Sequence, residues 1–306
     1  MKNELSEINL SNIPMSPRYL YTVDYIFTNP YYTVAAFEKE DFETGYHVQE
    51  FYEICIISKG SGYHVIEDTC VKASYGDVFI VPPGRKHAFV GGKGFNVYYI
   101  HLSPKFLNDY TPKMKALPSF LALFEIEPLM RANGAKYRHL YLDSNAMQEV
   151  LGILAIASNK YQHTPDTMII WESYIVIALT MLCREYEKLQ AKVGKNANND
   201  KLFVDSITMI LEKYNTKITI ESLARMAGLS RTAYIERFRE VMGTSPRHFI
   251  MSERIKAAKW LLSGTDTPIA KIADETGFYD TSHFSKCFTD AEGVSPTEYR
   301  KKATRK

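Results

Sequence analysis

The 306-residue sequence predicts an α+β chain of more than one domain. A small β-barrel followed by helices comes first, and an all-helical region forms the C-terminus. Three observations support this prediction: strand-like runs fill residues 31–102, helical periodicity takes over after Ser103, and residues 201–306 contain a degenerate repeat. Since a chain of this length exceeds what one hydrophobic core usually organises, we expect separate domains.

The strand-like runs are separated by short turns that contain glycine or proline. The runs are rich in β-branched and aromatic residues, which favour strands. In chain order they are YTVAAFEKE, FYEICIIS, YHVIE, DVFIV and FNVYYIHL. Strands at this spacing are typical of a compact barrel or a double-sheet jelly roll. Residues 1 to about 30 read as an irregular arm, and the first domain, arm and barrel together, is assigned to residues 1–143.

Behind the barrel, residues 144–190 are predicted to form helices that join two copies of the chain. Ser144 is a suitable N-cap for the first of them, and the second runs from about Asp166 to Gln190. One apolar stripe of the second helix has 4-3-4 spacing, which suits a partner helix but also suits packing on the chain's own barrel. The stripe consists of Ile170, Tyr174, Ile177 and Met181. The polar residues 191–200 read as a linker.

Charge and composition indicate a soluble chain whose C-terminal third meets a polyanion. Residues 1–200 carry 19 Lys/Arg against 22 Asp/Glu, a net −3, whereas residues 201–306 carry 18 against 13, a net +5. No stretch reads as a membrane span or a signal peptide. The cysteines lie far apart, so we expect no disulfide framework, no structural zinc site and a reducing cytoplasm. They are Cys55, Cys70, Cys183 and Cys287.

The C-terminal repeat starts at Ile218 and again at Thr267. An offset of 49 aligns Ile220 with Ile269, Ala224 with Ala273 and Gly228 with Gly277. Further along, an offset of 50 aligns Phe238 with Phe288, Gly243 with Gly293, Ser245-Pro246 with Ser295-Pro296 and Phe249 with Tyr299. The second copy therefore holds one extra residue in its turn.

Each copy has the local features of a helix-turn-helix. A short helix ends at Gly228 or Gly277, where the chain needs a positive φ, and a large apolar residue follows. Ser230 and Asp280 are suitable N-caps for the next helix, which has one buried stripe and one polar face. A polar helix face entered through a tight turn fits the DNA major groove. The alternative is an ordinary helical bundle with a duplicated hairpin.

The second copy contains GFYDTSHFSKCF at residues 277–288, GVSP at 293–296 and EYR at 298–300. These residues resemble the signature of the DNA-binding domain of the AraC/XylS family of bacterial regulators. The sequence departs from that pattern at residues 290–292, where a more basic run is common. The resemblance implies that residues 201–306 bind promoter or operator DNA sequence-specifically, and that RNA polymerase is a further partner to consider.

Carried over by position, the resemblance implies base-facing residues on both recognition helices. In the first helix they are Arg231, Thr232, Ile235 and Glu236. In the second they are Thr281, Ser282, His283, Ser285 and Lys286. Lys and Arg can read guanine edges, and Thr or Ile methyl groups can touch thymine methyl groups. For each single residue, a phosphate contact or a plain solvated surface stays open as an alternative.

Two motif fragments stand out in the barrel. The first is His47-x-Gln49-x₃-Glu53, and the second runs from Gly76 to His87. The even spacing of the first places its three side chains on one face of a strand, pointing together into the barrel. The fragments resemble those of cupin barrels, as in the sugar-responsive members of the AraC/XylS family. This resemblance implies a small-molecule effector, a sugar or polyol, inside the barrel.

The predicted ligand-binding residues are His47, Gln49, Glu53, Tyr63, His87 and Tyr99. Glu53 and His87 offer directional hydrogen bonds to hydroxyl groups, or else make structural hydrogen bonds. The two tyrosines can stack on a sugar ring, although most aromatics of a small barrel are core. Enzymatic cupins hold a metal on two histidines and a glutamate of the first motif and a histidine of the second. Because Gln49 stands at the second histidine position and is a poor ligand, we expect no metal and no cofactor.

Three functions compete at this point: a ligand-responsive transcription regulator, a cupin enzyme with an accessory nucleic-acid domain, and a constitutive architectural DNA-binding protein. The sequence contains no phosphate-binding glycine loop, no GxSxG and no HExxH, so we predict no catalytic residues and no enzyme. An architectural protein would leave the barrel without a purpose. We therefore expect a homodimeric regulator that a small ligand controls.

Overall fold

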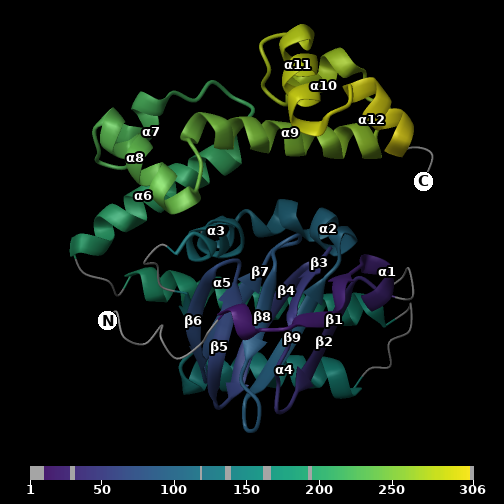
Figure 1. Cartoon of the computed structure of the whole chain (residues 1–306), viewed down its shortest axis with the longest axis vertical. Helices are drawn as coiled ribbons and strands as arrows, with labels where there is room; N and C mark the ends of the chain where they lie inside the picture. Colours follow the sequence, from purple (N-terminus) through teal and green to yellow (C-terminus); the bar gives the residue numbers. More distant parts are fainter. Residues whose placement is uncertain are drawn as a thin grey trace. The chain divides into compact units, whose positions relative to one another are not determined.

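The computed structural model describes residues 10–27, 32–117, 119–134, 139–160, 167–191 and 195–303. The chain divides into two compact units, Met1–Gly194 and Lys195–Lys306. Figure 1 shows strands and helices in the first unit and helices alone in the second. Within the described residues, no helix is long and apolar enough to cross a membrane.

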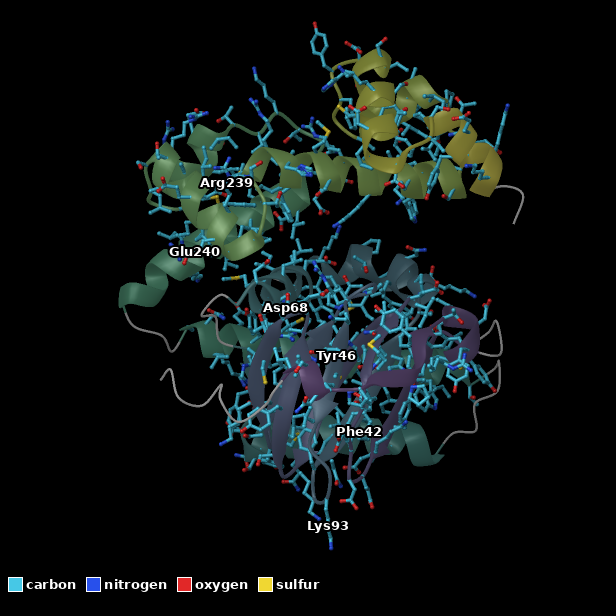
Figure 2. All side chains as sticks on the ribbon, viewed as in Figure 1. Phe42, Tyr46, Asp68, Lys93, Arg239 and Glu240 are labelled. Atoms are coloured by element: carbon cyan, nitrogen blue, oxygen red, sulfur yellow. The ribbon has the colours of Figure 1, made fainter. Side chains whose placement is uncertain are left out.

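The first unit contains two five-stranded sheets among its described residues, as the sequence predicts for a barrel. One sheet has the order β1 (Met15–Tyr21), β3 (Tyr46–Gln49), β8 (His87–Val90), β5 (Ser61–Ile66), β6 (Thr69–Ser74). The other has the order β10 (Leu140–Tyr141), β7 (Asp77–Val81), β4 (Tyr52–Lys59), β9 (Asn96–Leu102), β2 (Val34–Lys39). Aromatic and β-branched side chains pack between the sheets, with Phe79, Phe89 and Tyr99 in one cluster that Phe42, from the connection between β2 and β3, also joins. Figure 2 shows Phe42 within this unit and Lys93 at the tip of the turn between β8 and β9.

The N-terminal arm is more ordered than its sequence indicates. It contains a 3₁₀ turn (Leu10–Asn12), the strand β1 and a short helix α1 (Val23–Ile26). Strand β1 runs parallel to β3, with Tyr21 opposite Gln49. A Cβ on Gly45 would lie 2.6 Å from the carbonyl oxygen of Pro14, so only glycine lets the arm approach this closely. The prediction of an irregular arm is wrong here because this pairing is non-local and leaves no signal within the arm.

Helices follow the strands and cover the barrel. α2 (Pro104–Met114), the π-helical turn η2 (Ala122–Ile126) and α3 (Glu127–Ala132) come first, and α2 and α3 lie across one end of the strands (Figure 1). α4 (Ser144–Lys160) and α5 (Met168–Ala191) pack on each other and on β2. Glu172 of α5 accepts hydrogen bonds from Thr33, next to β2, and from Tyr110 of α2 at 2.8 Å. These bonds tie α5 to the barrel.

The second unit begins earlier than the sequence predicts. The predicted linker 191–200 is shorter, since α5 ends at Ala191 and α6 (Lys195–Lys213) already begins at Lys195. The six helices that follow are α7 (Ile220–Met226), α8 (Arg231–Met242), α9 (Pro246–Gly264), α10 (Ile269–Glu275), α11 (Thr281–Glu292) and α12 (Pro296–Ala303). In Figure 1, α7 and α8 lie at one end of the long helix α9, and α10 to α12 lie at the other.

The two copies of the repeat fold alike. Gly228 and Gly277 adopt φ of +67° and +81°, as expected for the turn. The hydroxyl of Ser230 and the carboxylate of Asp280 accept hydrogen bonds from the third backbone N–H of their helices. Each following helix buries its apolar stripe. The fully buried aromatics of these stripes are Tyr234 and Phe238 in α8, and Phe284 and Phe288 in α11.

Candidate nucleic-acid interface and ligand cavity

Helix α8 presents its predicted base-facing residues on the side away from its core. Arg231, Thr232 and Glu236 are exposed and Ile235 is half-buried. The guanidinium Nε of Arg231 lies 2.7 Å from a carboxylate oxygen of Glu221. Both side chains are about 60% exposed, and such a pair contributes little to stability. Arg231 can therefore exchange this partner for DNA at small cost.

Helix α11 has the same division of faces. Ser282, His283 and Lys286 are exposed, whereas Thr281 and Ser285 are half-buried. The ring of His283 also packs edge-on against Phe278, with 5.7 Å between the ring centroids. His283 therefore has a structural contact in addition to its predicted DNA contact. The structure brings every predicted DNA-binding residue to an accessible helix face, and its contact with DNA stays a prediction.

A cavity of about 230 Å³ opens inside the barrel. Four of the predicted ligand-binding residues line it: His47, Gln49, Glu53 and Tyr99. The further residues that line it are Tyr21, Tyr25, Ile26, Phe37, Lys39, Phe42, Thr44, Phe51 and His101. His87 lies behind Glu53 and is fully buried. The cavity therefore has polar groups at its inner end and mostly aromatic walls.

The lining of the cavity among the described residues includes neither Tyr63 nor His87, so this cavity does not support their predicted contact with a ligand. The neighbour of Tyr63 on β5, His64, is buried inside the barrel and stacks on Phe89 with 4.4 Å between the ring centroids. Since successive side chains of a strand point to opposite faces, Tyr63 faces away from the interior. The strand could be predicted from the sequence, but not which of its faces points inward.

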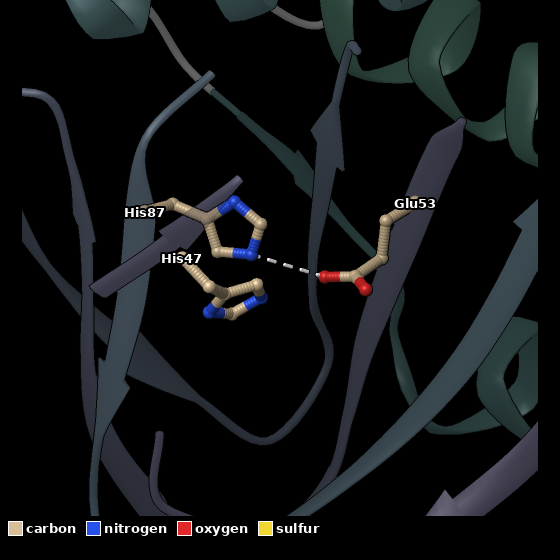
Figure 3. Close-up of side chains that lie close together, drawn as sticks. All are labelled: His47, Glu53 and His87. Carbon is tan, nitrogen blue, oxygen red and sulfur yellow. Dashed lines mark ion pairs between the residues drawn. The ribbon is translucent and has the colours of Figure 1, made fainter. Parts of the chain in front are cut away.

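Glu53 is the centre of the polar group. Its two carboxylate oxygens lie 2.9 Å from Nε2 of His101 and 3.2 Å from Nε2 of His87, and the thiol of Cys55 donates to the carboxylate at 3.3 Å. Figure 3 shows the ion pair with His87 and the ring of His47 beside it. Burial alone would raise the pKa of Glu53, but the two imidazoles outweigh burial and hold that pKa well below its usual value. Glu53 is therefore a carboxylate at neutral pH.

His47 is held as a neutral imidazole. Burial, reinforced by the neighbouring His87, lowers the pKa of His47 to about 4. Its Nδ1 lies 3.0 Å from the carbonyl oxygen of Gly45, so this nitrogen carries the proton and Nε2 is left as an acceptor. The two rings of His47 and His87 meet edge-on with 4.2 Å between their centroids.

Gln49 has unused hydrogen-bonding capacity. Its side chain is 1% exposed and lines the cavity, yet neither its amide oxygen nor its amide nitrogen has a partner among the described residues. Nδ1 of His101 is likewise buried without a partner in that part of the chain. A buried polar group without a partner costs about 1–3 kcal/mol. A ligand that donates and accepts hydrogen bonds at this point would recover that cost.

Three residues at the cavity meet the requirements for a metal ion in type and spacing. The ligand atoms of His47, Glu53 and His87 lie within 4.8 Å of one another. Two imidazoles and a carboxylate can hold a divalent transition metal, which would supply Lewis-acid chemistry or orient a ligand. Gln49 adds only a weak amide ligand, as the sequence indicates. The absence of a metal stays a prediction.

Sequence reasoning missed His101 and the arm. His101 shares a strand face with the predicted Tyr99, two residues earlier on β9, so alternation along FNVYYIHL was a signal that could have found it. Tyr21, Tyr25 and Ile26 come from β1 and α1, which reach the cavity only through the non-local pairing with β3. Nothing in the arm's own residues predicts this position.

The predicted dimerisation residues lie on the side of α5 away from the barrel. Ile170 and Ile177 are 36% and 45% exposed, and Tyr174 and Met181 are half-buried. The opposite face is fully buried, with Trp171, Ile175, Ala178, Leu179 and Leu182 against the rest of the unit. Packing on the chain's own barrel therefore uses the other face of α5, and the predicted stripe remains accessible.

Comparisons with known proteins agree with both units. Residues 29–124 match the family model of an AraC-like ligand binding domain, and residues 223–302 match that of a helix-turn-helix domain. The chain is a member of the AraC family of transcriptional regulators. This AraC-family regulator combines a ligand-binding domain with a DNA-binding domain on one chain.

Similar proteins span most of the regulator's length. It is 23% identical over 255 residues to an HTH-type transcriptional activator RhaR of Enterobacter sp. (strain 638), covering 83% of this chain and 86% of that protein. It is 24% identical over 257 residues to the RhaR activator of Escherichia coli (strain K12), with the same coverage. Among solved structures, an AraC-type transcriptional regulator from Chromobacterium violaceum is 22% identical, covers 35% of this chain and 96% of its own, and has a TM-score of 0.32.

Proposed function

We propose that this AraC-family regulator senses a small carbohydrate or polyol in its barrel and changes its affinity for promoter DNA in response. The observation that supports this most directly is Gln49, whose buried amide faces the cavity with no partner among the described residues. Next to it are the ionised Glu53 and the acceptor nitrogen of the neutral His47. Such a set matches neighbouring hydroxyl groups, each of which donates and accepts.

The size and walls of the cavity agree with a sugar. A volume of about 230 Å³ is below the range of pockets for drug-sized ligands, so the ligand is small. Phe37, Phe51 and Tyr99 supply aromatic faces for the apolar side of a sugar ring. The buried charge of Glu53 disfavours an anionic group at the inner end, because like charges repel strongly in a low dielectric. A neutral polyhydroxyl compound satisfies all three conditions.

The arm offers a route from the ligand to the rest of the protein. Tyr21 and Tyr25 line the cavity from β1 and α1, so a ligand inside would contact the arm directly. β1 is an edge strand and much of its length is exposed. An edge strand with few buried contacts is readily displaced, and ligand contacts would shift the balance between attached and released arm.

We further propose that two copies associate through α5. Ile170 and Ile177 expose apolar surface on the stripe that Tyr174 and Met181 continue. Two paired chains would bring two DNA-binding domains to one promoter. RNA polymerase would be a further partner at that promoter. A regulator of promoter DNA would work in the cytoplasm.

The carbohydrate proposal is tested by calorimetric titration of the full chain with a panel of monosaccharides and polyols. We expect at least one compound to bind, and Gln49→Leu, which keeps the volume but removes the amide, to weaken that compound at least tenfold. Gln148→Leu, at an exposed position on α4, serves as the matched control and should bind like wild type. Equal binding by wild type and Gln49→Leu would contradict the proposed site.

A further inference from the structure

The two helix-turn-helix copies differ by one residue in the turn. In both copies the large residue after the glycine donates its backbone N–H to the alanine five residues earlier, at 2.9 Å for Leu229 to Ala224 and for Phe278 to Ala273. In the first copy the N-cap Ser230 follows Leu229 directly. In the second copy Tyr279 is inserted between Phe278 and the N-cap, Asp280. Tyr279 is therefore the extra residue of the second copy.

Rigid neighbours hold Tyr279 on both sides. Phe278 is buried, and its ring centroid lies 5.0 Å from that of Phe284. Asp280 accepts a hydrogen bond from the N–H of His283 at 2.7 Å. A Cβ at Gly277 would lie 2.5 Å from the carbonyl oxygen of Asn215, so the turn is packed closely against the backbone just after α6. The residues on both sides of Tyr279 are therefore held by packing and by hydrogen bonds.

The side chain of Tyr279 itself is not packed against the protein. It is 94% exposed, more than any other large apolar or aromatic side chain in the described part of the chain. The ring thus adds almost nothing to the hydrophobic core, since burial is what makes an aromatic stabilising. It projects from the turn that leads into α11, one residue ahead of the N-cap and two ahead of Thr281.

We propose that Tyr279 contacts operator DNA, and that its phenol hydroxyl donates a hydrogen bond to a backbone phosphate at the edge of the groove that α11 enters. The first residues of a recognition helix meet base edges, so a residue ahead of the N-cap lies nearer the bordering sugar-phosphate strand. Tyrosine is one of the residues that bind phosphate oxygens and fix the position of a protein on duplex DNA.

A neutral donor suits this position. Asp280 places a carboxylate next to Tyr279, and its charge would partly cancel that of a Lys or Arg at position 279. A phenol hydroxyl needs no charge to reach a phosphate. The contact would exist only in the second copy, because the first copy has no residue at this place. The two recognition helices would then be held on DNA by unequal backbone contacts.

The test uses the full chain and a duplex that the wild-type chain selects from a random-sequence library. We expect Tyr279→Phe to weaken binding to this duplex roughly tenfold, the effect of one hydrogen bond to a charged acceptor. Tyr279→Ala should weaken it at least as much. The slope of affinity against salt should not change, since no cation is removed. Thermal stability of both variants should equal that of wild type.

Single methylphosphonate substitutions in the duplex then locate the contact. At one phosphate, the neutral substitution should weaken the wild-type chain while leaving Tyr279→Phe unaffected. Tyr141→Phe removes an exposed phenol from the other unit and should behave as wild type on every duplex. Wild-type affinity in both Tyr279 variants would overturn the proposal. If only Tyr279→Ala lost affinity, and only on duplexes with a particular base pair, the phosphate contact would be overturned. The ring would then contact a base instead. Failure of a sugar to bind the barrel would leave these measurements unaffected.

Discussion

Glu53 and His101 face each other across the β4–β9 pair, with Nε2 of His101 2.9 Å from a carboxylate oxygen of Glu53. His87 approaches the other carboxylate oxygen from the opposite sheet. The carboxylate thus joins both sheets at the inner end of the cavity. A polar group held from both sheets can orient a ligand without itself moving.

The stability of the chain should fall in weak acid because of His47. Its pKa is about 4 in the folded chain against 6.5 ordinarily. Between these values the unfolded chain binds a proton that the folded chain does not, so acid favours unfolding. Over this interval we expect a loss of at most about 3 kcal/mol in the free energy of unfolding. Denaturant titrations of the full chain at pH 7 and pH 5 measure it.

His47→Gln should remove this part of the pH dependence, whereas His248→Gln, at an exposed position of the other unit, should retain it. Glu53 acts in the same direction at lower pH. Its pKa is lowered on folding, so its contribution is present above the ordinary value of 4.5 and is lost as the pH falls through the lower folded value. A His47→Gln chain that loses as much stability between pH 7 and pH 5 as wild type would contradict this account.

Charged and buried residues of the recognition helices should respond oppositely to truncation. Lys286→Ala and Arg231→Ala remove exposed side chains, so each should cost roughly 1–3 kcal/mol of DNA binding if it meets a base edge, with no change in melting temperature. Phe284→Ala and Phe288→Ala remove fully buried rings and should each cost about 3–5 kcal/mol of stability. Gel shifts and thermal melts of the same samples separate the two classes. Equal losses of binding and stability in Lys286→Ala would show a structural role instead.

Self-association should depend on the exposed face of α5. Ile177→Asp places a charge on this face and should yield a folded monomer, as measured by light scattering with circular dichroism as the check on folding. Met226→Asp alters a residue of similar exposure in the other unit and should leave the dimer intact. A dimer that survives Ile177→Asp would move the interface to another surface.

The second unit should bind DNA without the first. Residues 195–306 form a compact unit of their own, and the sequence from residue 201 onward carries a net charge of +5. We expect the fragment Lys195–Lys306 to bind the selected duplex more weakly than the full chain. Its affinity should fall steeply with salt because cations on the protein replace counterions on the DNA. A fragment that shows no salt-sensitive shift of the duplex would contradict the assignment of DNA binding to this unit.

The helix-turn-helix repeat could be predicted almost in full because its signals are local. A turn glycine, an N-cap and a buried stripe each act within a few residues, so Gly228, Ser230 and Phe238 carry their structural roles in the sequence itself. The start of α6 was missed because polar residues 195–200 read equally well as linker or as helix. Composition alone does not separate the two states for a polar segment.

The barrel site could be predicted only in part, because its residues come together through strand pairing. His47, Gln49 and Glu53 share a motif and were found together, whereas His101 is opposite Glu53 only through the β4–β9 register. The face of a strand that points inward depends on register, and a shift of one residue exchanges the two faces. The sequence alone therefore does not show which face of β5 Tyr63 occupies, nor that Tyr21 reaches the cavity.

The most direct test of ligand control measures the affinity of the bound sugar or polyol in the presence and absence of the selected duplex. If the ligand changes DNA affinity, DNA must change ligand affinity by the same factor, and couplings of about 1–3 kcal/mol correspond to roughly 5- to 150-fold. We expect a change of this size in the ligand affinity of the full chain. The fragment Lys195–Lys306 lacks the cavity and should not bind the ligand, with or without the duplex. Equal ligand affinity of the full chain with and without the duplex would show that the compound is not an effector and that the barrel does not control DNA binding through it.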